Sequence, residues 1–406
     1  MGGALTKRKD TAEVLSETGQ VQTRRRLSLY DATFSLAAAR PVTEQRLVGG
    51  GIVPDDGRVP GGRRAFECPV SWGSCSRAGT DPLRPERENQ DCFVVEDRFG
   101  DCDGHLFASV MDGHGPHGTR AALYVRDSIA EQCLERAQRL RLEQRVVIEE
   151  AHAAADRQLR EESELDLFVS GTSALSILYQ TAAAAPVEAA VTHAVATLWI
   201  ANVGDGRIVL ARMAALPTPE CEQPALEAVE LSHDHTADRK DEAARILASG
   251  GRIFDWGVPR VWLKDVDMPG LAMTRSFGDD AASTVGVCCT PEITEHHLER
   301  RDCFAVVASD GVWSLIASDE AVRIVADALE REGADAQSAC DVLVAEAVRR
   351  WEAEEEVVDD ITVVLLVFGD RQTVGTGGVD GGGDPQLEAA DAGIVPEDED
   401  GVQVID

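Results

Sequence analysis

Leu106-Phe107-Ala108-Ser109-Val110-Met111-Asp112-Gly113-His114-Gly115 is an apolar run that ends in an aspartate, a histidine and two glycines. The apolar residues predict a buried strand, and the Asp-Gly step after them favours a tight turn. A single pattern of this kind marks a turn more often than a functional site. Its meaning therefore depends on whether other carboxylates occupy similar positions elsewhere in the chain.

Three further carboxylates adjoin strand-like apolar runs, at 306–309, 361–367 and 92–95: Asp310, Asp359 and Asp91 respectively. Burying an unpaired carboxylate costs several kcal/mol or more. No basic residue accompanies Asp112, Asp310 or Asp359 locally. The four positions together predict a centre that holds metal ions with oxygen ligands.

Length and charge limit the class of protein. The 406 residues are 44% hydrophobic and carry a formal net charge of −33. This length favours one large domain with flexible ends, and the acidic balance argues against nucleic acid as a ligand, since phosphate backbones attract basic surfaces. The chain has neither the run of about 18 apolar residues that a membrane helix needs nor the apolar core of a secretory signal. We expect a monomer without a nucleic-acid partner.

Cysteine usage indicates the compartment. The ten cysteines are scattered along the chain without C-x-x-C spacing. We interpret them as reduced thiols of a cytoplasmic protein, because neither a zinc site nor a disulfide framework is indicated.

The two ends of the chain differ in composition from its centre. Residues 1–65 are rich in turn-forming residues and mixed charge, and 371–406 are acidic and Gly-rich, so both predict mostly disordered segments around a domain at 66–370. Met1-Gly2-Gly3-Ala4-Leu5-Thr6 fits the pattern for myristoylation of Gly2. An acyl chain together with the basic groups at 7–9 and 24–26 would hold the protein at the cytoplasmic face of a membrane. A start that is merely disordered explains the same residues.

Periodicity predicts an α+β fold. Strands are expected near 91–96, 104–111, 172–180, 194–202, 206–212, 303–309 and 361–368. Helices are expected near 116–137, 142–163, 238–249, 318–331 and 336–353. Strands occur in groups and helices in pairs, which favours two packed sheets covered by helices on the outside.

Eight motifs, in this order along residues 70–368, resemble the PPM, or protein phosphatase 2C-like, family of metal-dependent Ser/Thr phosphatases. They are Asn89-Gln90-Asp91, Asp112-Gly113-His114-Gly115, Ser170-Gly171-Thr172-Ser173-Ala174, Ala201-Asn202-Val203-Gly204-Asp205-Gly206-Arg207, Asp234-His235, Leu271-Ala272-Met273-Thr274-Arg275-Ser276-Phe277-Gly278-Asp279, Ser309-Asp310-Gly311-Val312-Trp313 and Asp359-Asp360-Ile361-Thr362. The resemblance implies a four-layer α-β-β-α sandwich of two mainly antiparallel sheets, with a flap subdomain at about 236–278. Trp256 and Trp262 in this flap would either grip a protein substrate or pack the flap's own core.

The resemblance also implies a two-metal centre that binds Mg²⁺ or Mn²⁺, in which a metal-bridging hydroxide attacks the phosphate. Asp112 would bridge both ions, Gly113 would lend its carbonyl oxygen, and Asp310 and Asp359 would complete the ligands. His114 is the expected general acid.

Two more side chains complete the catalytic set that the resemblance implies. Asp91 would orient metal-bound water. Arg84 and Arg87 are both candidates for binding the phosphate, and we favour Arg87 because it directly precedes Glu88-Asn89-Gln90-Asp91.

The chain departs from the family's pattern at two positions. Gln90 stands where many members have Glu, which removes a negative charge near the metal waters. A third metal would be held by Asp205 and by an acidic residue at the position of Ser314. Because a neutral hydroxyl is a poor ligand for a hard cation, we expect this third site to be weak or empty. Ser232 and Asp234 resemble turn and cap residues ahead of the helix at 238–249.

These features favour an enzyme that hydrolyses phosphoserine and phosphothreonine in proteins, with phosphorylated proteins as partners in cytoplasmic signalling. The alternative is a pseudophosphatase, a catalytically weak binding or regulatory module, which Gln90 and Ser314 make conceivable. A metal-dependent enzyme for a small phosphoester is a third hypothesis. The presence of Asp112, Asp310 and Asp359 favours the enzyme.

Overall fold

The computed structural model describes residues 70–369, apart from 103, 141–142, 182–195, 216–224, 256 and 332. It also describes three short strands nearer the N-terminus, β1 (Glu13–Leu15), β2 (Val21–Thr23) and β3 (Arg58–Val59). The predictions for Gly2, for Trp256 and for the segment 371–406 lie outside the described residues, as does most of the segment 1–65. Within the described part of the chain, no helix has the length and apolar character needed to cross a membrane.

The first sheet is built around β18 (Ile361–Phe368), whose eight residues are all buried. Its sequence is a run of β-branched and aliphatic residues, which suits a strand covered on both faces. All pairings in this sheet are antiparallel. The strand order is β11 (Leu226–Glu230), β10 (Arg207–Met213), β17 (Asp302–Ala308), β18, β4 (Val70–Arg77) and β3.

The second sheet is also antiparallel and is built around β6 (His105–His114), the strand that carries the Asp-Gly-His-Gly motif. Its order is β15 (Phe277–Gly278), β7 (Gly171–Thr172), β6, β8 (Ala174–Thr181), β9 (Ala196–Val203) and β16 (Glu292–His297), and β5 (Asp91–Asp97) pairs with the other edge of β6. In the register of β5 with β6, Asp91 lies directly opposite Asp112.

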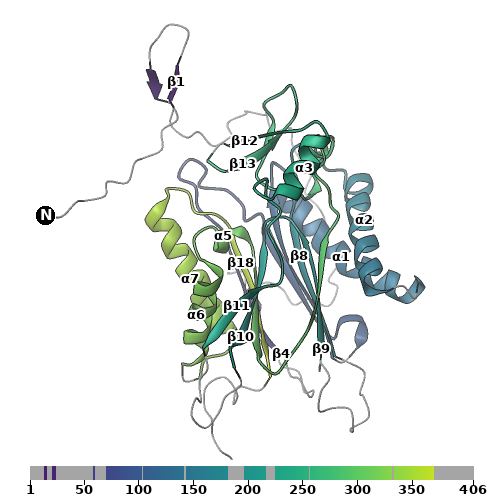
Figure 1. Cartoon of the computed structure of the whole chain (residues 1–406), viewed down its shortest axis with the longest axis vertical. Coiled ribbons are helices and arrows are strands. Elements are labelled where there is room, and N and C mark those ends of the chain that lie inside the picture. Colours follow the sequence, from purple (N-terminus) through teal and green to yellow (C-terminus); the bar gives the residue numbers. More distant parts are fainter. Residues whose placement is uncertain are drawn as a thin grey trace, which may run out of the picture.

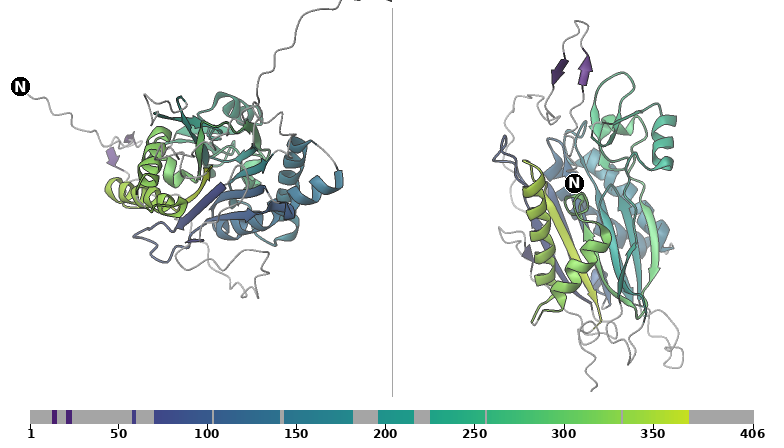
Figure 2. Two further views of the ribbon diagram at one scale, coloured as in Figure 1. Left: turned by 90° about the horizontal axis from the view of Figure 1, so that it is seen from below. Right: turned by 60° about the vertical axis from the view of Figure 1, so that its left-hand side comes forward.

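Two helix pairs cover the outer faces of the sheets (Figures 1 and 2). The helices α1 (Gly118–Leu140) and α2 (Gln144–Glu162) lie over the second sheet, and α6 (Ser318–Leu329) and α7 (Ala336–Glu354) lie over the first. A capping box between Asp335 and Ser338 begins α7. Three shorter segments are η1 (Phe99–Asp101), α4 (Asp280–Ser283) and α5 (Asp310–Trp313). The predicted α-β-β-α sandwich is confirmed.

Alternation along β18 separates two cores. Val363, Leu365 and Val367 pack with the cluster under α6 and α7, whereas Val364 and Leu366 belong to the cluster between the two sheets. Successive side chains of a strand point to opposite faces, so one strand serves both cores. The sandwich therefore has apolar packing on each side of the first sheet.

The flap is a separate small unit beside one end of the sandwich (Figure 1). It contains α3 (Lys240–Ala248) and a three-stranded sheet of β12 (Arg252–Asp255), β13 (Pro259–Trp262) and β14 (Pro269–Leu271). Trp262 is buried, and its ring lies so close to Gly270 that a Cβ there would come within 2.6 Å of it. Trp262 is thus enclosed by the flap's own strands, whereas Phe254 is 60% exposed.

Truncation of a side chain between the sheets tests the described packing. Ile177 on β8 is fully buried in that core. We expect Ile177→Ala to lower the free energy of unfolding by about 2–5 kcal/mol, because it removes apolar contact and leaves a cavity. Gln180→Ala, near the end of the same strand, should change it by less than about 0.5 kcal/mol. Urea denaturation measures the free energy of unfolding of both variants. Equal losses would contradict the burial of Ile177 between the two sheets.

Candidate metal centre

Three carboxylates converge at one end of the sandwich. Asp112 lies near the end of β6, Asp205 lies in the turn between β9 and β10, and Asp310 begins α5 after β17. One oxygen atom of each lies within 4.8 Å of the others. The cluster therefore takes side chains from both sheets, and like charges at this spacing require cations or protons between them.

The backbone of Asp112 is held by the Ser170–Ala174 motif. The N–H of Asp112 donates to Ser173 Oγ (3.1 Å), and its carbonyl accepts from the Ser173 N–H (2.9 Å) and from Thr172 Oγ1 (3.1 Å). These bonds lie at the point where β7 and β8 meet β6. The motif thus acts by fixing the carboxylate that precedes Gly113.

Gln90 closes the loop after Asp112. Its side-chain amide donates to the Gly115 carbonyl (2.8 Å), and its own carbonyl accepts from the Gly113 N–H (3.1 Å). A Cβ on Gly113 would come within 2.4 Å of the Gly118 carbonyl oxygen, and Gly115 has φ +82°, so both positions suit glycine. A glutamate at position 90 could not donate this hydrogen bond, which gives Gln90 a structural role of its own.

Hydrogen bonds from Asn202 and to His235 fix the turn that carries Asp205. The Asn202 amide donates to the carbonyls of Gly204, Gly206 and His233, and the Gly204 N–H donates to His235 Nδ1 (3.2 Å). Asp205 itself is 7% exposed. Its Oδ1 is buried and has no hydrogen-bond partner among the described residues, so this oxygen remains available to a ligand.

Burial and mutual repulsion raise the pKa values of Asp112, Asp205, Asp310 and Asp359. Burial, followed by the charges of neighbouring aspartates, raises the pKa of Asp205 to about 6 and those of Asp310 and Asp359 to about 7. The pKa of Asp112 is raised well above its ordinary value for the same reasons. An all-oxygen set of this kind, with the buried Oδ1 atoms of Asp205 and Asp91 unpartnered among the described residues, fits a hard divalent cation.

Asp359 and Arg87 lie beside the three clustered carboxylates. Asp359 is outside the 4.8 Å group, although the charge of Asp310 contributes to its raised pKa. Arg87 lies 3.8 Å from Asp359 and 2.8 Å from Asp360, with Asp360 buried behind it. The other candidate, Arg84, pairs with Asp81 instead (2.8 Å). The structure thus brings Arg87, rather than Arg84, to the metal centre.

Asp91 and Ser314 lie at the edges of the centre. Asp91 is buried opposite Asp112 and accepts a hydrogen bond from Ser309 Oγ (2.8 Å), while burial raises its pKa strongly. Ser314 is exposed just after α5. Asp205 therefore lies in the cluster, but position 314 adds no carboxylate to it. That a third metal site is weak or empty stays a prediction.

His114 meets an unexpected partner. Its Nε2 lies 2.6 Å from Oδ2 of Asp279, which is 1% exposed. Burial alone would lower the pKa of His114, but the adjacent Asp279 carboxylate raises it, and the net shift is upward. Asp279 ends the Leu271–Asp279 motif, which by itself predicts no role for this residue. No spacing along the chain indicates that residues 114 and 279 meet.

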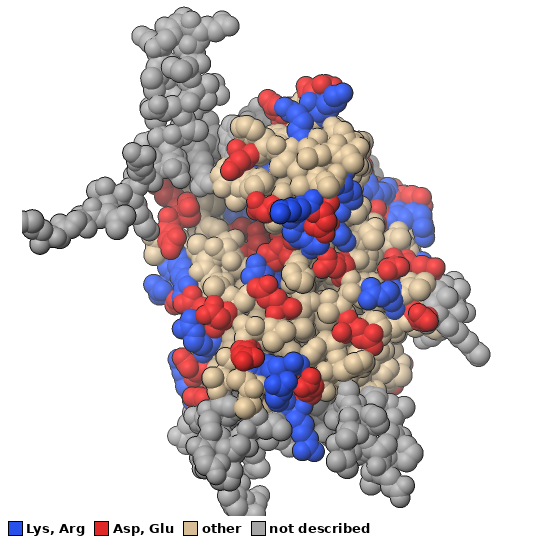
Figure 3. Space-filling model, viewed as in Figure 1, with Lys and Arg blue, Asp and Glu red and all other residues tan. Residues whose placement is uncertain are grey.

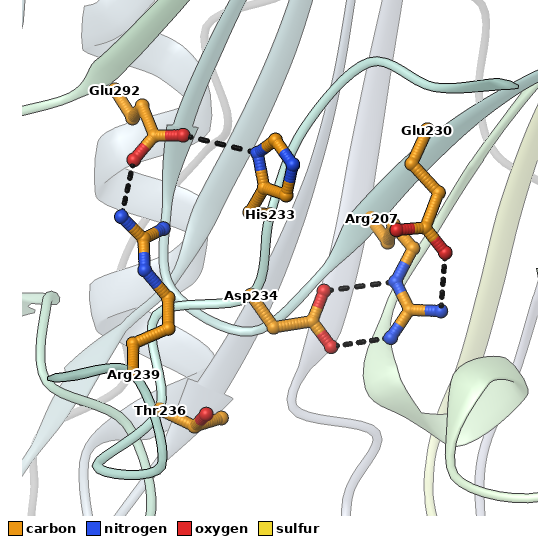
Figure 4. Close-up of a pocket in the computed structure, with 7 residues that line it drawn as sticks. All are labelled: Arg207, Glu230, His233, Asp234, Thr236, Arg239 and Glu292. Carbon is orange, nitrogen blue, oxygen red and sulfur yellow. Dashed lines mark hydrogen bonds and ion pairs between the residues drawn. The ribbon is translucent and has the colours of Figure 1, made fainter.

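A charged pocket of about 530 Å³ is lined by ionisable side chains, among them Arg207, Asp234 and Glu292 (Figure 4). In it, Asp234 forms a two-pronged ion pair with Arg207, and Glu292 pairs with Arg239 and His233. The expectation that Asp234 caps the following helix is wrong, because α3 begins only at Lys240. Asp234 instead holds Arg207, and its charge contributes to the raised pKa of Asp205.

Known proteins resemble this chain in sequence over most of the described domain. The family model for protein phosphatase 2C matches residues 86–355. Probable protein phosphatase 2C 73 of Arabidopsis thaliana is 33% identical over 305 residues, which cover 68% of this chain and 75% of the plant protein. Probable protein phosphatase 2C 34 of the same plant is 32% identical over 328 residues, which cover 75% and 84%.

A solved structure shares the fold. The crystal structure of serine-threonine phosphatase 2C from Toxoplasma gondii matches with a TM-score of 0.61 at 18% identity, over 77% of this chain and 98% of the other. The sandwich and its carboxylate cluster define a metal-binding hydrolase. The chain belongs to the protein phosphatase 2C family, and it is a protein phosphatase of this metal-dependent class.

The raised pKa values predict how the stability of metal-free protein depends on pH. Folded-state pKa values near 7 for Asp310 and Asp359 exceed the unfolded value of about 4. Between these values the folded protein binds more protons than the unfolded chain, so its stability falls as pH rises. We expect the Tm of chelator-treated protein to fall from about pH 5 to about pH 8, and Mn²⁺ to raise the Tm more at the higher pH.

Thermal denaturation across this pH range measures the effect, with Asp310→Asn as the comparison. That variant lacks one of the titrating groups and should show a shallower slope. A metal-free Tm that rises with pH would contradict the protonated cluster.

Proposed function

We propose that this protein hydrolyses phosphoserine and phosphothreonine in other proteins, in a reaction that requires two divalent ions, Mg²⁺ or Mn²⁺. The observation that supports this most directly is the convergence of Asp112, Asp205 and Asp310 within 4.8 Å, next to Arg87 and His114. An anion-binding guanidinium, an oxygen-ligand centre and a histidine are what hydrolysis of a phosphate monoester requires.

The two ions would be held by Asp112, Asp310 and Asp359, together with the carbonyl of Gly113. When bound, they would neutralise phosphate charge and supply a nucleophilic water. Asp112 is suited to a shared ligand because its backbone is fixed by hydrogen bonds from the neighbouring strands. The closed loop at Gly113 keeps the carbonyl in place.

Arg87 would bind the phosphate. Its guanidinium is 18% exposed and is held by Asp360 and by the carbonyl of Val358. A guanidinium fixed on one side still has N–H groups that can donate to phosphate oxygens on the other. Asp360 therefore orients Arg87 beside Asp359, the proposed metal ligand that directly precedes Asp360 in the chain.

His114 would donate a proton to the departing seryl or threonyl oxygen, and Asp91 would orient water near the centre. His114 follows the metal ligands directly in the chain, and the charges of Asp205 and Asp310 act on it. The Oδ1 atom of Asp91 is buried and unpartnered among the described residues, so it can accept a hydrogen bond from water.

Surface charge is consistent with protein substrates. The formal net charge is −33, and the face in Figure 3 shows acidic and basic side chains interspersed rather than a continuous basic area. Basic phosphorylated segments would be attracted to so acidic a protein. We propose phosphorylated proteins of the cytoplasm as the substrates.

Metal-dependent phosphate release tests this function. We expect the full-length protein to release phosphate from a phosphothreonine peptide with Mn²⁺ or Mg²⁺ and not with chelator. Asp310→Asn should lower kcat by roughly 100-fold or more, since it removes a charge from the ion-binding cluster. The control is Asp327→Asn, the same substitution at an exposed position of α6, which should leave kcat unchanged.

The alternatives are outcomes of this experiment. A folded protein that binds metal but releases no phosphate from any peptide would favour a binding module. Release from small phosphoesters only would favour the third hypothesis. Equal activity of wild type and Asp310→Asn would contradict the metal centre.

Acylation of Gly2 would place the enzyme at the cytoplasmic face of a membrane. We expect the protein made in a eukaryotic cell to carry the mass of one myristoyl group in place of Met1, and Gly2→Ala to lack it. Wild type should sediment with vesicles containing phosphatidylserine, whereas Gly2→Ala should stay largely in solution. An unmodified native N-terminus in intact-mass spectrometry would end this proposal.

A further inference from the structure

We propose that Asp279 is a positioning residue for His114, which fixes the imidazole so that Nδ1 is the ring nitrogen directed to the leaving group. This inference rests on the proposed function and adds a residue to its site. The pair joins β6 to the segment between β15 and α4, which are 165 residues apart in the chain. It therefore depends on the fold rather than on local sequence.

The contact between the two side chains is short and enclosed. The Nε2–Oδ2 distance is 2.6 Å, and the exposed fractions of the side chains are 15% for His114 and 1% for Asp279. A hydrogen bond to a carboxylate at this distance, away from water, fixes both the plane of the ring and the nitrogen that is engaged. Nε2 is therefore committed to Asp279.

Asp279 itself is held in an uncommon conformation. Its backbone has φ +50°, a left-handed value that few residues other than glycine adopt. Ser276 Oγ donates to the same Oδ2 (2.6 Å), and the Asp279 N–H donates to the Ser170 carbonyl (2.9 Å). A Cβ on Gly171 would come within 2.3 Å of Oδ2. The surroundings thus leave this carboxylate a single position.

One face of α2 supports the same segment. His152, Asp156 and Arg160 are spaced four residues apart, which places them on one side of the helix. The His152 ring lies 5.8 Å from the ring of Phe277, and Asp156 accepts a hydrogen bond from the Gly278 N–H (3.0 Å). Arg160 donates to the Gly278 carbonyl and pairs with Asp280.

These contacts bracket Asp279 on both sides along the chain. Phe277 and Gly278 precede it, and Asp280 follows it. A helix on the outer face of the second sheet therefore supports the segment whose carboxylate contacts His114. Such buttressing is typical of groups whose exact position matters.

The second ring nitrogen of His114 remains for the substrate. Nδ1 is buried and has no hydrogen-bond partner among the described residues. In hydrolysis, the P–O bond to the seryl or threonyl oxygen breaks, and that oxygen takes the Nδ1 proton. Water forms the new P–O bond and releases a proton to solvent, from which His114 is protonated again. Asp279 keeps Nε2–H in place through its hydrogen bond.

Substrates whose leaving groups differ in basicity distinguish the positioning of His114 by Asp279 from a purely structural role of Asp279. A threonyl oxygen needs a proton in order to leave, whereas p-nitrophenolate is a stable anion. We expect Asp279→Asn to lower kcat for a phosphothreonine peptide by roughly 10- to 100-fold, with KM little changed, and to lower kcat for p-nitrophenyl phosphate by less than about threefold. A loss of folding or of metal would reduce both rates together.

Coupling to His114 is the second measurement. Because Asp279 acts through His114, the double variant with His114→Asn should be no slower on the peptide than His114→Asn alone. Asp327→Asn is the matched control for the same chemical change. Equal loss on both substrates, no loss on the peptide, or additive effects in the double variant would overturn the inference.

A spectroscopic measurement keeps the test independent of turnover. In protein labelled with ¹⁵N-histidine, the proton shared by Nε2 and Asp279 should give a strongly deshielded imidazole resonance, absent from both single variants. Absence of this resonance from wild type would overturn the positioning. Failure of the proposed function is recognised separately, because wild type would then release no phosphate from the phosphothreonine peptide, and the catalytic part of this inference would fall with it.

Discussion

Repulsion between buried carboxylates is the constraint on which this structure depends. Asp112 near the end of β6, Asp205 in the turn after β9 and Asp310 at the start of α5 are far apart in the chain, and only a rigid framework keeps their oxygens within 4.8 Å. The two-sheet core supplies that framework, because the strands that end at the cluster are packed along their whole length. The Ser173 hydroxyl, which accepts from the Asp112 N–H, and the Asn202 side-chain amide, which donates to the His233 carbonyl, then hold the backbone around the cluster. The packing of the two sheets thus holds close together carboxylates that would otherwise repel one another.

Much of the fold could be predicted because the long elements have clear periodicity. The five longer helices and the core strands lie within a few residues of their expected positions. The strands that were missed have weak patterns for physical reasons. Strand β4 consists mainly of small residues, with Trp72 and Cys75 three positions apart and no regular alternation, and β16 has Ile293 as its only aliphatic residue. Their pairing with β18 and β9 decides their conformation, and this information is not local.

The site likewise contains residues that local sequence patterns predict and contacts that depend on the fold. The carboxylates, His114 and Arg87 were predicted because each stands beside a strand or inside a compact motif. Two features could not be read from the sequence. The bond from Gln90 to Gly115 depends on how a loop folds back, and the pair of His114 with Asp279 depends on contact between distant strands. A substitution that looks like a loss, Gln90 in place of an acid, is in the structure a donor that the loop uses.

The origin of the cluster in both sheets has a mechanical consequence. Asp112 belongs to one sheet, and Asp310 follows a strand of the other. A cation bound by both carboxylates would link the two sheets, whereas the same carboxylates, when ionised without a cation, would repel each other. Loading with metal would therefore stiffen this end of the sandwich as well as equip it for chemistry. Catalysis and rigidity would then depend on the same bound ions.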